Sequence, residues 1–166
     1  MVAQEVRSHL GRSDAALIAE LYPRLRSFAS VVAPAGEDPN DLVQEALLRT
    51  LRRGSLSRLD HPGAYLRTAI YHAAVSARRH WAAEHNAVVQ VVPAPVLPED
   101  PWQVEELLRL PPKARAVLYL HVIEGLTYFE VGDQLGCSAA SARKTASRAK
   151  RRLRRLMVAG VNDATA

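Results

Sequence analysis

The residues best suited to chemistry lie near the C-terminus, where side chains able to bind DNA recur at helical spacing. From Ala139 to Arg155 there are eight Lys or Arg residues and no Asp or Glu. A helix of this charge, presented behind a tight turn, suits the major groove of DNA. One stripe of the helix is polar, and we expect it to meet base edges and phosphates: Ser141, Lys144, Thr145 and Arg148.

The opposite stripe of this helix is small and apolar, and we expect it to pack inward. Its residues fall at positions i, i+4, i+7 and i+11: Ala142, Ala146, Ala149 and Leu153. A shorter helix over Thr127–Leu135 and a turn at Gly136 and Cys137 precede it, which predicts a helix-turn-helix. Gly132 costs roughly 1 kcal/mol of helix propensity relative to alanine, so we expect it where the two helices cross closely.

Two further residues complete the candidate DNA contacts of this helix, Ser138 and Arg143. Ser138 fits the N-cap position, which leaves free backbone N–H groups near a phosphate. The alternative is an ordinary solvated basic helix at the end of a bundle. Of the neighbours Tyr128 and Phe129, we expect one to pack in the core and the other to lie near the DNA backbone, in an order that the pattern leaves open.

Composition limits the class of protein. A net charge of +5 favours an anionic partner. No apolar run approaches the roughly 18 residues that span a membrane, and the N-terminus lacks an apolar signal core, so we expect a cytoplasmic protein without direct membrane insertion. Cys137 is the single cysteine, which excludes an internal disulfide. No Ser-His-Asp set, metal-spaced ligands or Gly-rich phosphate loop is present, so we expect no enzyme, cofactor or metal site.

Apolar residues recur at helical spacing in the N-terminal half. We expect a first helix over 14–32, capped by Asp14, and a second over 40–53, capped by Asn40. A third helix is expected over 64–83. The apolar face of the first helix is Leu17, Ile18, Leu21, Leu25 and Phe28. The expected buried side of the second is Leu42, Ala46, Leu47 and Leu51.

The segment VVQVVPAPVLPEDP carries four prolines and no helical period. We therefore expect a linker over 85–101, although its valines could instead form a short strand. Trp81 and Trp102 bracket this linker, and each either docks it or caps the core of its own domain. Further helices are expected up to Leu110 and over 112–124. The sequence predicts an all-α fold of two small helical domains joined by a Pro-rich linker.

Three segments resemble bacterial RNA polymerase sigma factors of the sigma-70 family, in its extracytoplasmic-function group. The run LPPKARAVLYLHVIEGLTYFEVGDQLGCS, with the basic helix behind it, resembles region 4. DPNDLVQEALLRTLRR resembles region 2.2, and HPGAYLRTAIYHAAVSARR resembles regions 2.3 and 2.4. The resemblance implies that the first domain, residues 10–84, is region 2. It implies that the second, residues 102–158, is region 4 with its helix-turn-helix.

In such sigma factors region 2 binds the clamp helices of the polymerase β′ subunit. The resemblance implies that role for Asp38, Asp41, Gln44 and Glu45. Asp41, Gln44 and Glu45 share one helical face, because spacings of three and four align on a helix. A purely structural interpretation of Asp41 is that it favours the helix N-terminus through the helix dipole, and both roles are compatible.

By the same resemblance, regions 2.3 and 2.4 open the promoter and read the minus-10 element, and the loop before the third helix captures a flipped base. The implied contacts are Ser57, Arg58, Asp60, His61, Tyr65, Arg67, His72, Arg78 and Arg79. Tyr65 stands where the family usually has Trp, His72 where it often has Asn, and Ser76 where it often has Asp. These departures predict a weaker promoter-melting surface.

The resemblance implies a sigma factor that binds core RNA polymerase, at the β′ clamp helices and the β flap, and directs promoter-specific initiation. Promoter DNA is the second partner, and the family admits an anti-sigma factor as a third. The alternative is a stand-alone helix-turn-helix regulator that binds DNA without polymerase, against which the acidic Asp38–Glu45 segment argues. A protein that merely sequesters a regulator would leave the basic helix without a purpose.

Overall fold

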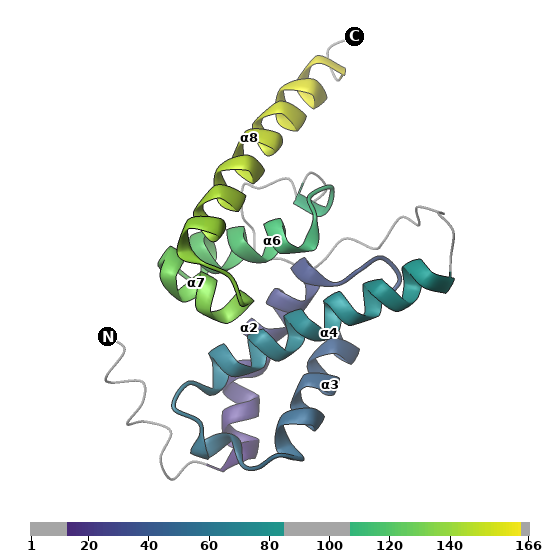
Figure 1. The fold of residues 1–166 in the computed structure, drawn as a ribbon. Helices are drawn as coiled ribbons and strands as arrows, with labels where there is room; N and C mark the ends of the chain where they lie inside the picture. The colour runs from purple at the N-terminus through teal and green to yellow at the C-terminus, as the bar shows by residue number, and fades with distance from the viewer. Residues whose placement is uncertain (1–12, 85–106, 164–166) are drawn as a thin grey trace. The chain divides into compact units, whose positions relative to one another are not determined.

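The computed structural model describes residues 13–84 and 107–163, and every regular element within these ranges is helical (Figure 1). The chain divides into two compact units, one containing residues 13–84 and the other residues 107–163. The predicted all-α fold with two small helical domains is therefore confirmed. The expected linker over 85–101, the alternative strand within it, Trp102 and the side chain of Trp81 lie outside the described residues.

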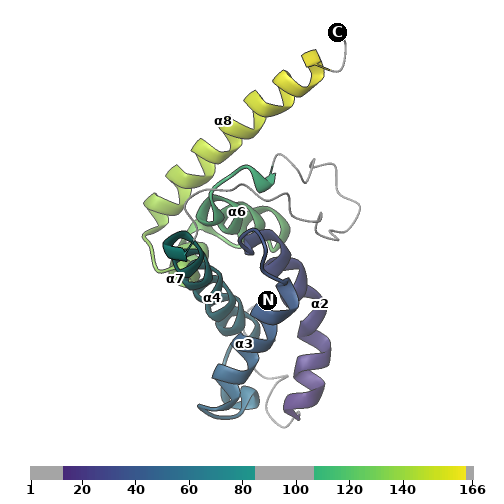
Figure 2. The same ribbon diagram turned by 90° about the vertical axis from the view of Figure 1, so that its right-hand side faces the viewer.

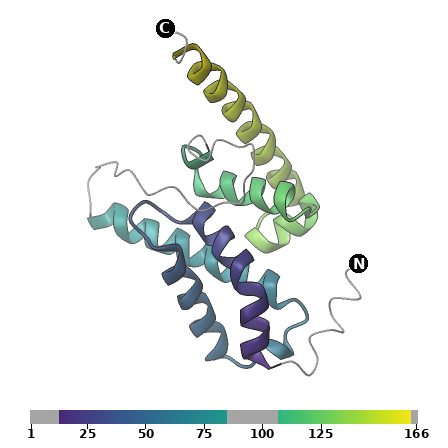
Figure 3. The same cartoon turned by 180° about the vertical axis from the view of Figure 1, so that it is seen from behind.

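The N-terminal unit is a bundle of three long helices with one short 3-10 turn. Its elements are α2 (Asp14–Val32), α3 (Pro39–Leu51), η1 (Leu56–Arg58) and α4 (Pro62–Glu84). Each long helix packs against the other two (Figures 2 and 3). Large apolar side chains from all three fill the core: Leu17, Leu25, Phe28, Leu42, Val43, Leu66 and Ile70. Each such burial stabilises the fold by roughly 1.5–3 kcal/mol.

Both predicted caps in this unit are wrong by one or two residues. The N-cap of α2 is Ser13, whose Oγ accepts a backbone N–H at 3.3 Å, and not Asp14. The N-cap of α3 is Asp38, whose Oδ1 accepts the N–H of Asn40 at 2.8 Å. Pro39 begins this helix, where its missing N–H leaves no hydrogen bond unmade. Asn40 is therefore inside the helix.

The buried side of α3 is the predicted one except at its end. Leu42, Ala46 and Leu47 are buried, but Leu51 is 37% exposed, so its predicted place in the core is wrong. The helix ends at Leu51, before the predicted residue 53, and its last turn turns Thr50 inward instead. Thr50 Oγ1 donates to the Ala46 carbonyl at 2.7 Å, which satisfies the buried hydroxyl within the helix.

The apolar face predicted for α2 is confirmed at its centre. Leu17, Leu25 and Phe28 are fully buried. Ile18 and Leu21 are only half-buried at the edge of the face.

A carboxylate at the start of α2 ties down the loop before α4. Asp14 Oδ1 accepts from Ser55 Oγ at 2.7 Å and from the Ser57 N–H at 3.1 Å. The two serine hydroxyls also lie 2.6 Å apart. The Ser55 hydroxyl, with the backbone N–H groups of Ser57 and Leu56, lowers the pKa of Asp14 below its ordinary 3.8. Since these contacts join residues more than 40 positions apart, they fix where η1 begins.

The C-terminal unit consists of α6 (Pro112–Leu118), the π-helical turn η2 (Tyr119–Ile123), α7 (Tyr128–Leu135) and α8 (Ala139–Asp163). The predicted helix over 112–124 therefore exists, but its last part is π-helical. The core comes from α6, η2, α7 and α8 together: Val117, Leu120, Val131, Ala142 and Ala146 are fully buried. With Ala149 and Leu153 also buried, the inward stripe predicted for α8 is confirmed.

The predicted helix-turn-helix is present, and its local signals explain where each part starts. Thr127 Oγ1 accepts the Glu130 N–H at 3.3 Å, and Glu130 Oε2 accepts the Thr127 N–H at 2.8 Å, which is a capping box. These Thr127 contacts lower the pKa of Glu130. The helix ends at Leu135 and its C-cap is Gly136, whose φ of 66° is the left-handed conformation that glycine adopts without strain.

Gly132 meets the turn that leads into α8. A Cβ at this position would lie 2.4 Å from the Cys137 carbonyl oxygen and 3.2 Å from the Ala139 nitrogen. The Gly132 carbonyl in turn accepts the Cys137 N–H at 2.8 Å. The predicted close approach at Gly132 is confirmed, and the partner is the backbone of the turn. Only a residue without a side chain permits it.

Gly132→Ala is expected to destabilise the C-terminal unit by about 1–3 kcal/mol, because the new methyl group overlaps backbone that cannot rotate away. On an unobstructed helix the same change would stabilise by up to about 1 kcal/mol, so the sign is diagnostic. Urea unfolding followed by circular dichroism measures it. Asp133→Ala, at the exposed next position, is the matched control and should be near neutral. An equal or greater stability of Gly132→Ala would contradict the proposed constraint.

Asp14→Asn is expected to change the pH dependence of stability. Because the folded pKa of Asp14 is lowered, its contribution is complete above its ordinary pKa of 3.8 and is lost as pH falls through the folded value. The difference in free energy of unfolding between wild type and Asp14→Asn should therefore shrink from pH 5 towards pH 3. Asp60→Asn, at an exposed position in the same loop, is the charge-matched control. A difference that stays constant with pH would refute the role of the carboxylate.

Candidate functional site

The predicted acidic face lies on the solvent side of α3. Asp41 and Gln44 are exposed and Glu45 is half-buried, so the three predicted residues do share one surface, here called the acidic α3 surface. Glu45 forms an ion pair with Arg49 one turn later. Both partners are largely solvated, so this pair contributes little to stability. The surface presents carboxylate and amide oxygens in a protein whose net charge is positive.

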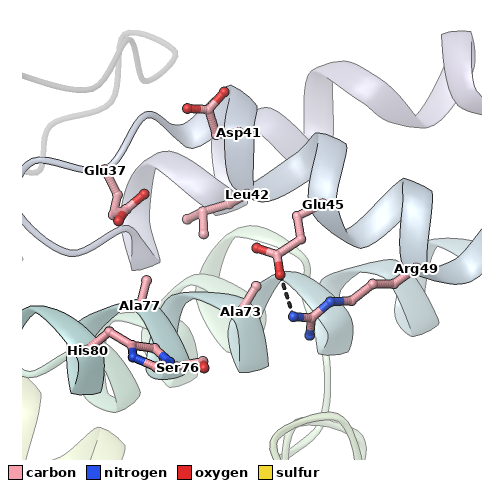
Figure 4. A pocket seen from close by; sticks show the side chains of 9 residues that line it. All are labelled: Glu37, Asp41, Leu42, Glu45, Arg49, Ala73, Ser76, Ala77 and His80. Atoms are coloured by element: carbon pink, nitrogen blue, oxygen red, sulfur yellow. Dashed lines mark ion pairs between the residues drawn. The ribbon is translucent and has the colours of Figure 1, made fainter.

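A recess of about 220 Å³ separates the acidic α3 surface from α4 (Figure 4). Its lining carries three carboxylates but a single guanidinium, that of Arg49, which is already paired with Glu45, so the recess is net negative. Such a site suits a cationic side chain of a partner better than an anion. Its lining residues are Glu37, Asp41, Leu42, Glu45, Arg49, Ala73, Ser76, Ala77 and His80. No group of three or more His, Cys, Asp or Glu side chains within 13–84 and 107–163 is arranged to hold a metal ion.

Asp38 occupies a different position from the other three predicted residues. Its Oδ1 accepts from the side-chain amide of Asn40 at 3.0 Å as well as from the Asn40 N–H. Asn40 Oδ1 accepts from Tyr22 OH and from Arg26 Nε, each at 3.1 Å. These bonds join the start of α3 to α2, so Asp38 orients the helix that carries Asp41. Sequence reasoning missed this network because its members lie 14 to 18 residues apart.

Leu48 was missed as a surface residue. Its side chain is 55% exposed, and it follows Gln44 by four residues and Asp41 by seven. These spacings place it on the same side of α3, which therefore changes from acidic to apolar along its length. Leu51 continues the apolar end. The helical period alone could have identified Leu48, because it falls outside the predicted buried side.

The loop residues predicted to meet the minus-10 strand lie around η1 and the start of α4. Arg58, Asp60 and His61 are exposed, whereas Ser57 is half-buried in the hydrogen bonds to Asp14. Tyr65 is 38% exposed, and its hydroxyl accepts from Arg53 Nη1 at 3.3 Å. Sequence reasoning did not include Arg53, whose position depends on how α3 ends.

The remaining predicted minus-10 residues divide between two sides of α4. Tyr65, His72 and Arg79 recur every seven residues and so form one stripe, on which His72 and Arg79 are exposed. Arg67 and Arg78 lie roughly 100 to 160° around the helix from that stripe, at about 100° per residue. The structure therefore does not bring the five side chains onto one surface. A single strand running along the stripe would meet three of them.

The predicted reading face of α8 is solvent-accessible. Lys144 and Arg148 are exposed, and Ser141 and Thr145 are half-buried beside them. Ser138 is the N-cap, as predicted, because its Oγ accepts the Ser141 N–H at 3.1 Å. Its hydroxyl therefore holds the helix start.

The order of the two aromatic residues at the start of α7 is now defined. Tyr128 is half-buried and stacks on His121 with ring centroids 4.1 Å apart, and the Arg143 guanidinium lies 5.8 Å from its centroid. Phe129 is 75% exposed. Tyr128 is thus the packed residue of the pair.

No helix in the described part of the chain is both long enough and apolar enough to cross a membrane.

Known proteins match both units. The family model for sigma-70 region 2 matches residues 17–83, and the model for sigma-70 region 4 matches residues 104–153. The RNA polymerase sigma-E factor of Streptomyces coelicolor is 32% identical over 155 residues, which cover 86% of this chain and 84% of that protein. The match to region 2 disfavours the stand-alone regulator, whose resemblance would be limited to the helix-turn-helix.

A solved structure shares the fold. It is the sigma factor RpoE from Bartonella quintana, crystallised with the anti-sigma factor NepR. It has a TM-score of 0.68 and 24% identity, and the match covers 86% of this chain and 95% of that one. Two region matches in the predicted order, an all-helical fold and a relative of nearly full length agree. The chain belongs to the sigma-70 family, in its extracytoplasmic-function group, and is a sigma factor that directs transcription initiation.

Proposed function

We propose that the two units divide promoter recognition as region 2 (residues 10–84) and region 4 (residues 102–158). The N-terminal unit would bind the β′ clamp helices through the acidic α3 surface and hold the minus-10 strand along η1 and α4. The C-terminal unit would place α8 in the minus-35 major groove. The observation that carries this proposal is the acidic α3 surface, an exposed carboxylate patch on a basic, DNA-binding protein.

The chemistry of α3 supports a protein partner over a nucleic acid. Carboxylates at Asp41 and Glu45 repel phosphates, and the adjoining recess is net negative. The exposed Leu48 adds an apolar contact beside the charges, and an apolar patch bordered by polar groups is the usual arrangement of a protein interface. The polymerase contact therefore comprises Asp41, Gln44, Glu45 and Leu48, with Asp38 acting through the helix start.

The remaining partners follow from family and surface together. Val122 and Ile123, the last two residues of η2, are 40% and 46% exposed, and they offer the β flap an apolar contact on the C-terminal unit. The Bartonella relative was solved with an anti-sigma factor, which supports an equivalent regulator for this chain. The protein would act in the cytoplasm, where polymerase meets the chromosome, and would leave catalysis to the polymerase.

Asp41→Ala combined with Gln44→Ala is expected to weaken core polymerase binding about tenfold or more, because central interface contacts each contribute upwards of about 1 kcal/mol. Fluorescence anisotropy of labelled protein titrated with core measures the affinity. The thermal midpoint should fall only slightly, since both side chains are solvated and Asp41 contributes at most about 1 kcal/mol through the helix dipole. Asp133→Ala removes the same charge from an exposed position on α7, and this variant should bind core polymerase normally. Wild-type affinity of the double variant would exclude this surface as the clamp contact.

Lys144→Ala and Arg148→Ala are each expected to weaken minus-35 recognition, since losing a base-reading pair costs about 1–3 kcal/mol. Footprints of the holoenzyme on a cognate promoter, with run-off transcription in parallel, provide the measurement. Arg154→Ala, also exposed on α8 but on another side, is the charge-matched control. If the wild type and the three variants protect the upstream element identically, α8 presents a different face to the DNA.

A further inference from the structure

Three side chains from three elements of the C-terminal unit form one stack. His121 lies in η2, Tyr128 begins α7, and Arg143 belongs to α8. The His121 and Tyr128 rings are 4.1 Å apart and inclined by 24°, and Arg143 Cζ lies 5.8 Å from the tyrosine ring centroid. The first contact is a ring stack and the second is within the range of a cation–π interaction.

His121, the first member of this stack, is anchored to the backbone. His121 Nδ1 lies 2.8 Å from the Leu126 carbonyl oxygen, which can only accept, so Nδ1 carries a hydrogen and donates it. The Leu126 N–H bonds back to the Leu120 carbonyl at 3.0 Å. The π-helical turn and the segment after it thus fix the plane of the imidazole. Tyr128 rests on a ring that is held in place.

Arg143 is not part of the predicted reading face of α8. At about 100° per residue it lies roughly 100 to 160° around the helix from Ser141, Lys144, Thr145 and Arg148. It is exposed, so its charge is available to a ligand. Its guanidinium is held beside the start of α7. A cation at the flank of a recognition helix can reach the sugar-phosphate backbone while neighbouring side chains enter the groove.

We infer that Arg143 is a phosphate contact, and that Tyr128 and His121 are positioning residues that hold its guanidinium in place for DNA. This rests on the proposed insertion of α8 into the minus-35 groove and assigns Arg143 a role different from that of Lys144 and Arg148. A contact to a phosphate is independent of base sequence. The stack restricts the rotamers of a long side chain before DNA arrives, which lowers the entropy lost on binding.

The test is the affinity of holoenzyme for a promoter fragment over a series of salt concentrations, on a matched and a minus-35-substituted sequence. One phosphate contact contributes about 0.9 to the slope of log K against log salt, which is about fivefold in affinity near 0.15 M salt. Arg143→Ala should show that loss equally on both fragments. Arg154→Ala, three turns further along α8, should retain the slope of the wild type.

A double-mutant cycle tests the positioning role. Tyr128→Leu removes the aromatic face and should weaken DNA binding two- to fivefold when Arg143 is present. The same change should have no effect when it is combined with Arg143→Ala. Tyr128→Phe keeps the ring and should bind as wild type. His121→Leu should show the same dependence on Arg143, and thermal midpoints identify any variant that unfolds.

Three results would overturn the inference. A change in discrimination between the two fragments with Arg143→Ala would make Arg143 a base reader. Additive losses for Tyr128→Leu and Arg143→Ala would make Tyr128 a purely structural residue. An unchanged slope for Arg143→Ala would remove the phosphate contact. If Lys144→Ala and Arg148→Ala also leave DNA binding unchanged, the proposed role of α8 fails as well. If those two weaken it, only the stack's role fails.

Discussion

The approach of Gly132 to the backbone of the turn before α8 is the constraint on which the C-terminal unit depends. With no Cβ in the way, the turn packs directly against α7, and the Cys137 N–H reaches the Gly132 carbonyl. That spacing lets the alanine stripe of α8 close against the rest of the unit. The same spacing brings Arg143 over Tyr128. Small residues at the contact therefore determine where the large charged ones are displayed.

In the N-terminal unit, carboxylates hold the elements that carry the exposed surfaces. Asp14 holds the loop that begins η1, and Asp38 holds the start of α3 against α2 through Asn40. Both acids lie at helix starts, where the helix dipole also favours negative charge. Each thereby fixes the position of the surface next to it. In both units, then, one set of residues fixes the position of the helices, and another set is exposed on their surface.

The sequence predicts most of this arrangement because helical period and turn chemistry are local. The alanine stripe of α8, the Ser138 cap and the close approach at Gly132 all follow from spacing and residue type. The caps at Ser13 and Asp38 were missed because another residue that can cap a helix, Asp14 or Asn40, follows each of them closely. Which of the two residues caps the helix depends on the conformation of the loop before it. Leu51 was misplaced because its burial depends on where α3 stops. Spacing gives the angle of a side chain on its helix, but not what lies across from it, so Arg143 could not be paired with Tyr128.

The ion pair between Glu45 and Arg49 bears on how selective the acidic α3 surface can be. A partner cation that approaches Glu45 finds the carboxylate already occupied, so the encounter exchanges one guanidinium or ammonium for another. The net charge paired at Glu45 is the same before and after, and the gain in affinity from that residue is correspondingly small. What changes is geometry, because only a partner that matches the helix can displace Arg49 and hold the carboxylate better. As part of the proposed polymerase contact, Glu45 would discriminate among basic proteins, and the carboxylate of Asp41 would attract them.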